Sequence, residues 1–311
     1  MKKLKLLSLA VCTALLASTN SLPALASTSS EVLQPETFTI YSYDCETGEE
    51  EYIELDTSFV TEQLNKGITN ISTASFEGTA NDESIGISPQ DVIGGTDSRY
   101  RIYDTTQSLY RPVCFLNVEF AGGSSATGTG FLVGPDIVLT AAHMVNDLDY
   151  GNASSISVTP AKNGNTEPPY ETFKGTTIYL PDKWNGSRYP AYDWAVIRLK
   201  NLNGTSTTIG NKIGYFDLKY LSGDSLNTIS VFVTGYAGDK SEGTMWRSGG
   251  SITYTETNLI YYDCDTGKGD SGAPVTNSAN KVIGIHIGVS GASNRGVRVT
   301  QEVVSTVDSL K

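Results

Sequence analysis

The sequence predicts an all-β domain, a barrel or sandwich of many short strands, with one helix at its C-terminus. From Val92 onward, short runs rich in β-branched and aromatic residues alternate with Gly, Asn, Asp and Pro, which interrupt strands. Only residues 301–310 show helical spacing, with Val303, Val304 and Val307 on one face. Many short strands followed by one terminal helix are typical of a barrel or sandwich.

The expected strands are short apolar runs bounded by turn residues. In chain order they are Val113–Phe120, Gly130–Gly134, Asp136–His143, Asp193–Leu199, Thr228–Tyr236, Asn258–Cys264 and Lys281–Gly288. The polar stretch Asn201–Ser206 falls between the fourth and fifth runs, and it suggests a junction between two halves.

Residues 1–26 have the features of a secretory signal peptide. Lys2, Lys3 and Lys5 precede a short apolar run, and the segment closes on Ala24-Leu25-Ala26. A basic start, an apolar core and small residues before the cut define such a signal. The run is too short to span a bilayer, so we expect a secreted, extracellular protein without a membrane anchor.

The net charge of -12 is unevenly distributed along the chain. Residues 27–90 contain 13 acids and one base, Lys66, whereas residues 92–311 contain 20 acids and 18 bases. Such asymmetry indicates a tail or a separate module, or else a solvated acidic leader with no partner. A nucleic-acid partner is not expected, because nothing here forms a basic patch.

Two cysteines, Cys114 and Cys264, lie in the nearly neutral part of the chain. They could form one disulfide or remain two small buried apolar residues. Their wide spacing does not suit a zinc cluster, and we expect neither a metal nor a cofactor.

The tetrapeptide Gly269-Asp270-Ser271-Gly272 is a candidate nucleophile turn. Glycines on both sides of a serine allow a sharp turn and close approach of a substrate, and they leave amides free to face an oxyanion. A serine hydroxyl needs a base, usually histidine, and the chain has only two histidines.

His143 and Asp193 are the candidate base and the residue that orients it. Small Ala141 and Ala142 precede His143 and leave room for its imidazole to turn toward a cleft. Asp193 opens an apolar strand, where a carboxylate is costly to bury without a partner. Holding one tautomer of a catalytic histidine would supply that partner.

These motifs resemble those of the chymotrypsin-like serine proteases, and most closely those of secreted bacterial glutamyl endopeptidases. The resemblance covers Val92 to Lys311 and is carried by these segments: VIGGTDSR, TGTGFLVGPDIVLTAAH, NGSRYPAYDWAVIRL, VTGYAGDKSEGTMW, KGDSGAP, GIHIG and NRGVRVT.

The resemblance implies two six-stranded antiparallel β-barrels, at about 92–200 and 201–300, with a C-terminal helix at about 301–310. It places the His143, Asp193 and Ser271 triad in the cleft between the barrels, with the amides of Gly269 and Ser271 as the oxyanion hole. It also implies that residues 27–91 are a propeptide and that 92–311 are the protease domain.

The chain departs from the glutamyl endopeptidases at Asp270, where they tend to carry Asn or Gln. In trypsin-like zymogens the equivalent Asp pairs with a newly freed N-terminal amine, which Val92 could supply. In the glutamyl endopeptidases that amine instead helps to bind the substrate glutamate. Both roles require removal of residues up to about Asp91, and the sequence leaves the choice open.

The specificity pocket contains two opposing signals. His286 and Thr266 match the histidine and hydroxyl that glutamyl endopeptidases place there, and an imidazolium with a hydroxyl suits a carboxylate. Asp265 occupies the position of the acid with which trypsin binds Lys or Arg, although it could instead support His286.

We therefore expect a secreted serine endopeptidase, made as a zymogen, that cleaves after Glu and less efficiently after Asp. Alternatives are trypsin-like cleavage after Lys or Arg directed by Asp265, and a protease-fold binding protein without activity. The expected partners are protein or peptide substrates and the chain's own propeptide in cis, and we expect a monomer.

Overall fold

The computed structural model describes residues 33–68, 70–73, 97–200, 208–221, 226, 229–291 and 293–311. The predicted signal peptide, Val92 and the Asn201–Ser206 junction lie outside the described residues. Residues from Leu33 onward form one compact unit.

The first barrel is closed and antiparallel. Its strands are β5 (Val113–Phe120), β6 (Ser125–Leu132), β7 (Ile137–Thr140), β9 (Gly151–Pro160), β10 (Phe173–Pro181) and β11 (Ala195–Lys200). They are hydrogen-bonded in the order β10-β11-β7-β6-β5-β9, and pairing of β9 with β10 closes the barrel. A short strand, β8 (Asn146–Asp147), extends from β9.

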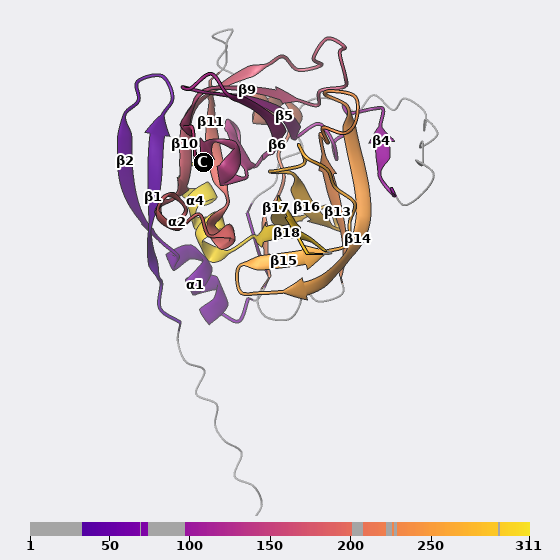
Figure 1. Cartoon of the computed structure of the whole chain (residues 1–311). Helices are drawn as coiled ribbons and strands as arrows, with labels where there is room; N and C mark the ends of the chain where they lie inside the picture. Colours follow the sequence, from indigo (N-terminus) through magenta and orange to yellow (C-terminus); the bar gives the residue numbers. More distant parts are fainter. Residues whose placement is uncertain are drawn as a thin grey trace, which may run out of the picture. The chain divides into compact units, whose positions relative to one another are not determined.

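The second barrel also has six strands. Figure 1 labels them β13 to β18. Its strands are β13 (Ser230–Gly235), β14 (Met245–Thr255), β15 (Leu259–Tyr262), β16 (Pro274–Asn277), β17 (Val282–Ser290) and β18 (Ser293–Arg298). Their order is β13-β16-β17-β18-β15-β14, and pairing of β13 with β14 closes the barrel. Strand β4 (Tyr100–Ile102) pairs with the other edge of β14. The prediction of two six-stranded antiparallel barrels is confirmed.

The predicted C-terminal helix is α4 (Gln301–Ser309). Thr300 caps it, because its hydroxyl accepts a hydrogen bond from the Val303 amide. Val303, Val304 and Val307 are fully buried, which confirms the predicted apolar face. Two short helices, α2 (Asp182–Ser187) and α3 (Ile209–Ile213), occur in connecting segments. Within the described residues, no helix is both long and apolar enough to span a membrane.

Several predicted strand boundaries are wrong; β6, for example, begins at Ser125 rather than Gly130. Two of the wrong boundaries lie at candidate site residues. The strand expected to run to His143 ends at Thr140, and His143 lies in a 3-10 helix, η1 (Ala142–Met144). The strand expected to begin at Asp193 begins at Ala195, and Asp193 follows a second 3-10 helix, η2 (Pro190–Tyr192). Ladder pairing ends at Thr140 and Ala195, so the two backbones are free to turn.

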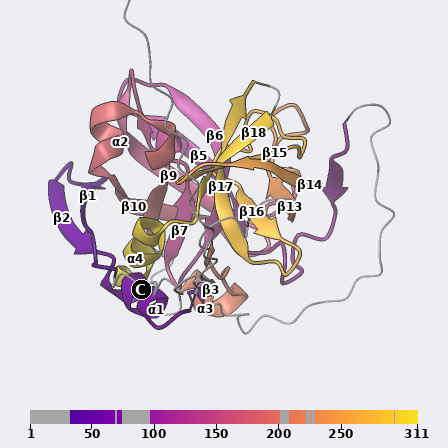
Figure 2. The same ribbon diagram turned by 90° about the horizontal axis from the view of Figure 1, so that it is seen from below.

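The acidic N-terminal segment (residues 33–73) is folded rather than a solvated leader. A hairpin of β1 (Thr37–Asp44) and β2 (Glu50–Asp56) joins the first barrel, because β1 pairs with β10. Helix α1 (Ser58–Asn65) lies against α4 (Figure 2). Strand β3 (Asn70–Ser72) pairs with β12 (Lys219–Leu221).

The three cysteines in the described residues are free thiols. Cys114 and Cys264 are buried in the first and second barrel respectively, and Cys45 is half-buried near the hairpin turn. Cys114 and Cys264 therefore form no disulfide with each other, and the described residues contain none.

Candidate active site

His143 and Asp193 meet at the edge of the first barrel. The His143 Nδ1 atom lies 2.8 Å from Asp193 Oδ2, and the His143 backbone amide donates to Oδ1 at 2.9 Å. Both oxygens of the carboxylate are thus used by one residue, which fixes the position and the orientation of the imidazole. The Asp193 side chain is 8% exposed and that of His143 33% exposed, so the ring remains open to solvent on one side.

Electrostatics around His143 favour its protonated form. Burial by itself would lower the pKa of the imidazole. The charge and hydrogen bond of Asp193, with a contribution from the charge of Asp147, outweigh burial and raise the pKa of His143 above its usual value. A base with this environment can accept a proton and hold it beside a carboxylate.

Ser271 lies on a tight turn between β15 and β16. The Gly267 amide donates to Asp270 Oδ2 at 2.8 Å, and the Ala273 amide donates to the Asp270 carbonyl at 2.8 Å. Beyond the serine, the Gly272 amide donates to the carbonyl of His286 at 2.8 Å. The first two bonds hold the turn together, and the third fastens it to strand β17 of the second barrel.

Strand β6 of the first barrel fastens the other side of this turn. The Thr129 amide donates to the Ser271 carbonyl at 2.9 Å, and the Thr129 hydroxyl donates to the Gly269 carbonyl at 2.8 Å. A Cβ placed on Gly128 would lie 2.5 Å from the Met144 side chain and 3.4 Å from the Ser271 carbonyl oxygen. Strand β6 therefore places the serine turn beside the 3-10 helix that carries His143.

Two glycines of the turn are required by its geometry. Gly272 has a φ of 83°, and a Cβ there would lie 2.1 Å from both the Thr129 carbonyl and the Thr140 hydroxyl. Gly269 has a φ of 95°, and its Cβ would lie 2.5 Å from the Tyr236 carbonyl. Both positions combine a left-handed backbone with close approach of another chain segment.

The candidate oxyanion donors are available. Among the described residues, neither the Gly269 amide nor the Ser271 amide donates to a protein acceptor. The described side chains also include no hydrogen bond between Ser271 Oγ and His143, although the two residues lie on neighbouring segments. Such bonds are often long before a substrate binds.

Asp270 is a buried carboxylate without an ion-pair partner among the described residues. It is 3% exposed and accepts one backbone hydrogen bond, from Gly267. Burial raises the pKa of Asp270 to about 7, although the Gly267 amide and the charge of Arg99 oppose the shift. Arg99 itself pairs with Asp97 and Asp239.

His286 lies in β17 and is 2% exposed. Its Nδ1 atom is 2.6 Å from the hydroxyl of Tyr262, which is fully buried. Burial, and next the charge of His143, lower the pKa of His286 to about 3. Burial therefore favours the neutral imidazole at His286, whereas the sequence suggested an imidazolium.

Thr266 is already hydrogen-bonded. Its hydroxyl donates to Asn294 Oδ1 at 2.7 Å, and Asn294 Nδ2 donates to the Cys264 carbonyl at 2.5 Å. The amide of Asn294 thus connects Thr266 to the backbone that follows β15.

Asp265 faces the N-terminal end of the described protease domain. Its Oδ2 atom accepts hydrogen bonds from the Ser98 amide at 2.7 Å and the Ser98 hydroxyl at 2.6 Å. Among the described residues, no hydrogen bond joins Asp265 to His286. The structure therefore provides no contact through which Asp265 would support His286.

Sequence reasoning missed Thr129, Tyr262, Asn294 and Ser98. Thr129 lies in the motif TGTGFLVG, and Tyr262 lies in the run that precedes Ser271. Neither sequence position indicates which residue its side chain contacts. Their contacts join segments far apart in the chain, so only the folded structure reveals them.

Comparison with known proteins agrees with this geometry. Residues 128–285 match the family described as "Trypsin-like peptidase domain". A glutamyl endopeptidase of Bacillus licheniformis is 35% identical over 229 residues, which are 70% of this chain and 68% of the relative. A solved structure, "Structure of Glu endopeptidase in complex with MPD", matches with a TM-score of 0.61 and 29% identity, covering 71% of this chain and 99% of that one.

A relative from Bacillus subtilis, named "Extracellular metalloprotease", is 36% identical over 226 residues, which are 71% of this chain and 70% of the relative. In the described part of this chain, no three His, Cys, Asp or Glu residues gather so as to hold a metal ion. The matched domain and the glutamyl endopeptidase relatives agree with the serine turn described above. The chain therefore belongs to the trypsin-like peptidases of the chymotrypsin-like superfamily, and it is a serine endopeptidase.

Proposed function

We propose that the protein is a secreted endopeptidase, made as a zymogen, that cleaves after glutamate and less efficiently after aspartate. Ser271 is the nucleophile, His143 the general base and then acid, and Asp193 the residue that orients the base. The observation that carries the catalytic part is the use of both Asp193 oxygens by His143, next to a serine turn that strand β6 holds in place.

In this mechanism the Nδ1 proton of His143 is held by Asp193, so Nε2 accepts the Ser271 hydroxyl proton. The serine oxygen attacks the substrate carbonyl carbon, and the amides of Gly269 and Ser271 stabilise the resulting oxyanion. His143 then protonates the leaving amine. Water repeats the sequence on the acyl-enzyme and releases the second product.

Labelling with a fluorophosphonate tests the nucleophile and separates the enzyme from a binding protein of the same fold. We expect processed protein to be labelled on Ser271 alone. Ser271→Ala should remain folded, resist labelling and lose several orders of magnitude in rate. Properly processed protein that stays unlabelled would refute the catalytic assignment.

The glutamate preference is supported by the relatives named glutamyl endopeptidases and by the surroundings of His286. A neutral imidazole can donate one hydrogen bond to a carboxylate, and a charge-assisted bond contributes about 1.5–3 kcal/mol. Thr266 is the second contact, and it must exchange its bond with Asn294 to donate to a substrate.

Substitution of His286 by Ala tests this pocket. We expect the ratio of kcat/KM for matched Glu and Gln peptides to fall by about one to two orders of magnitude, since 1.36 kcal/mol is tenfold. Asp265→Asn is the matched control, because its carboxylate is bonded to Ser98. If Asp265→Asn abolishes cleavage while His286→Ala does not, Asp265 determines specificity.

Activation by removal of residues up to about Asp91 is supported by Asp270. A buried carboxylate without a cation is a suitable partner for the new amine of Val92, although that amine could instead line the pocket. N-terminal sequencing of active secreted enzyme should find a chain that begins at or next to Val92. Full activity in a chain that still begins at Ser27 would overturn this proposal.

The N-terminal segment acts, in this proposal, as a folding aid bound in cis to the first barrel. Phe38, Ile40 and Tyr41 are buried in the common core, and the Asn152 side chain donates to the Tyr41 hydroxyl at 2.7 Å. Among the described residues of this segment, no hydrogen bond reaches His143, Ser271 or His286. The hairpin therefore supports the barrel from outside the site.

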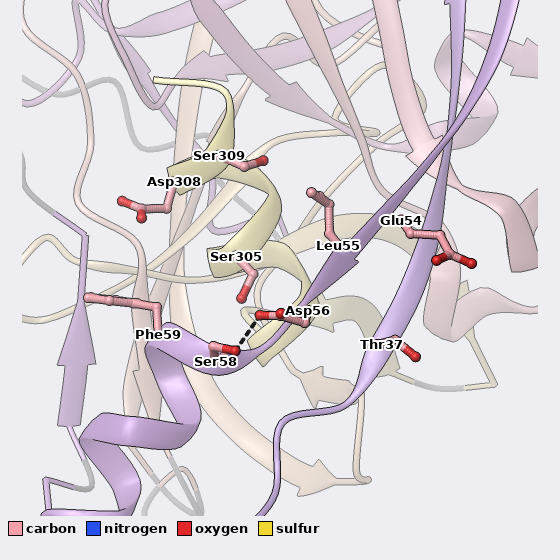
Figure 3. A pocket seen from close by; sticks show the side chains of 9 residues that line it. All are labelled: Thr37, Glu54, Leu55, Asp56, Ser58, Phe59, Ser305, Asp308 and Ser309. Carbon is pink, nitrogen blue, oxygen red and sulfur yellow. Dashed lines mark hydrogen bonds between the residues drawn. The ribbon is translucent and has the colours of Figure 1, made fainter.

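The interface between this N-terminal segment and α4 contains a cavity. Figure 3 shows a cavity there, lined by the following residues of the two sides: Thr37, Glu54, Leu55, Asp56, Ser58, Phe59, Ser305, Asp308 and Ser309. Refolding of residues 92–311 with and without added segment 27–91 tests the role. Equal yields would exclude a folding aid.

A further inference from the structure

The contact between Tyr262 and His286 lies in the interior of the second barrel. The two residues are 0% and 2% exposed, and the Tyr262 hydroxyl is 2.6 Å from His286 Nδ1. A buried phenol and a buried imidazole each need a hydrogen-bond partner, because an unpaired polar group costs about 1–3 kcal/mol. Among the described residues, each provides the only side-chain partner that the other has.

The register of three neighbouring strands, and a glycine in the middle one, leave room for this contact. Strand β18 lies between β15 and β17, and it pairs Asn294 with Tyr262 and Gly296 with His286. A Cβ on Gly296 would lie 2.8 Å from the Ile285 carbonyl and 3.3 Å from the Tyr262 hydroxyl. Glycine at position 296 thus lets the tyrosine reach across one strand to the histidine.

The direction of the hydrogen bond follows from the protons available. Burial lowers the pKa of His286, and burial with the charges of Cys264 and Asp270 raises the pKa of Tyr262, so both groups are neutral. A neutral phenol has one proton. If Nδ1 donated to the phenol, the phenol proton would need another acceptor, and the described side chains provide none.

We propose that Tyr262 is a positioning residue that donates to Nδ1 of His286 and fixes the tautomer in which Nε2 carries the proton. In this tautomer Nε2 can donate to a substrate carboxylate, whereas the other tautomer would present a lone pair to it. The inference rests on the proposed glutamate specificity. It assigns that specificity to the proton on Nε2 of His286.

Imidazole ¹⁵N NMR tests the tautomer directly. The chain has only two histidines, so His143→Gln leaves a spectrum of His286 alone. We expect a protonated Nε2 and an unprotonated Nδ1 in the full chain, and a mixture of tautomers after Tyr262→Phe. Protonated Nδ1 in the chain that retains Tyr262 would overturn the inference, and this spectrum does not depend on folding of the Tyr262 variant.

Kinetics test the consequence for specificity. In processed enzyme, Tyr262→Phe should lower the kcat/KM ratio of Glu to Gln peptides by about tenfold, mainly through KM, equivalent to about 1.4 kcal/mol. A merely structural defect would lower both substrates equally. Tyr261→Phe is the matched control, because its hydroxyl donates to Glu256 and should leave the ratio unchanged.

The two measurements separate failure of the inference from failure of the proposed function. If the enzyme with Tyr262 and His286 intact does not prefer Glu over Gln, the proposed specificity fails, while the spectrum still decides where the proton lies. If Glu is preferred and the ratio is unaffected by Tyr262→Phe, the positioning role is refuted and the specificity stands.

Discussion

Asp270 should make the unprocessed chain less stable as the pH rises. Its pKa is about 7 in the folded chain against 3.8 for a free carboxyl, a difference equivalent to about 4 kcal/mol. Since the folded pKa is raised, the stabilising contribution is complete below pH 3.8 and is lost as the pH rises through 7. Asp270→Asn removes this titration and keeps an oxygen that can accept from the Gly267 amide.

Denaturant unfolding of the full chain in a Ser271→Ala background, which cannot cleave itself, measures the effect. We expect Asp270→Asn and its parent to differ little at pH 4, and the variant to be more stable by up to about 4 kcal/mol at pH 8. Asp149→Asn provides the same charge change at an exposed position. Parallel pH profiles for Asp270→Asn and its parent would refute the argument.

The same pair of proteins in processed form distinguishes the two roles of the new amine. If the ammonium of Val92 pairs with Asp270, Asp270→Asn should destabilise the processed enzyme at pH 7, because a buried charge loses its partner. If the amine lines the specificity pocket, the variant should remain the more stable protein and glutamate binding should be unaffected.

Three further substitutions test the supports of the site. Gly272→Ala should destabilise the fold by more than about 2 kcal/mol and abolish fluorophosphonate labelling, because its Cβ would overlap the Thr129 carbonyl. Thr129→Val should slow labelling with an unchanged circular dichroism spectrum, because the Gly269 carbonyl loses its donor. Tyr41→Phe should cost about 1 kcal/mol in the unprocessed chain only, since the proposed processing removes Tyr41.

The apolar strands were the easiest part of the fold to predict. Val113–Phe120 is a strand with the predicted bounds, and α4 differs from its prediction by one residue. Strand β14 (Met245–Thr255) was missed because it carries two glycines and alternates little. The hairpin of β1 and β2 was hidden by its acidic residues, although Phe38 and Ile40 are buried.

The candidate site was predictable where spacing and residue type decide the chemistry. Two histidines and one serine turn left few choices, and the structure brings His143 to 2.8 Å from Asp193. The Tyr262–His286 contact was not predictable, because it depends on the register of three strands. That burial disfavours the imidazolium of His286 was missed for a related reason, since burial is a property of the assembled barrel.

A cleavage profile of processed enzyme on a peptide library tests the central claim most directly. The residue before the scissile bond should be glutamate, with aspartate cleaved less efficiently and Lys or Arg not cleaved. Cleavage after Lys or Arg, with acidic residues ignored, would show that Asp265 determines the specificity and would contradict the role given to His286.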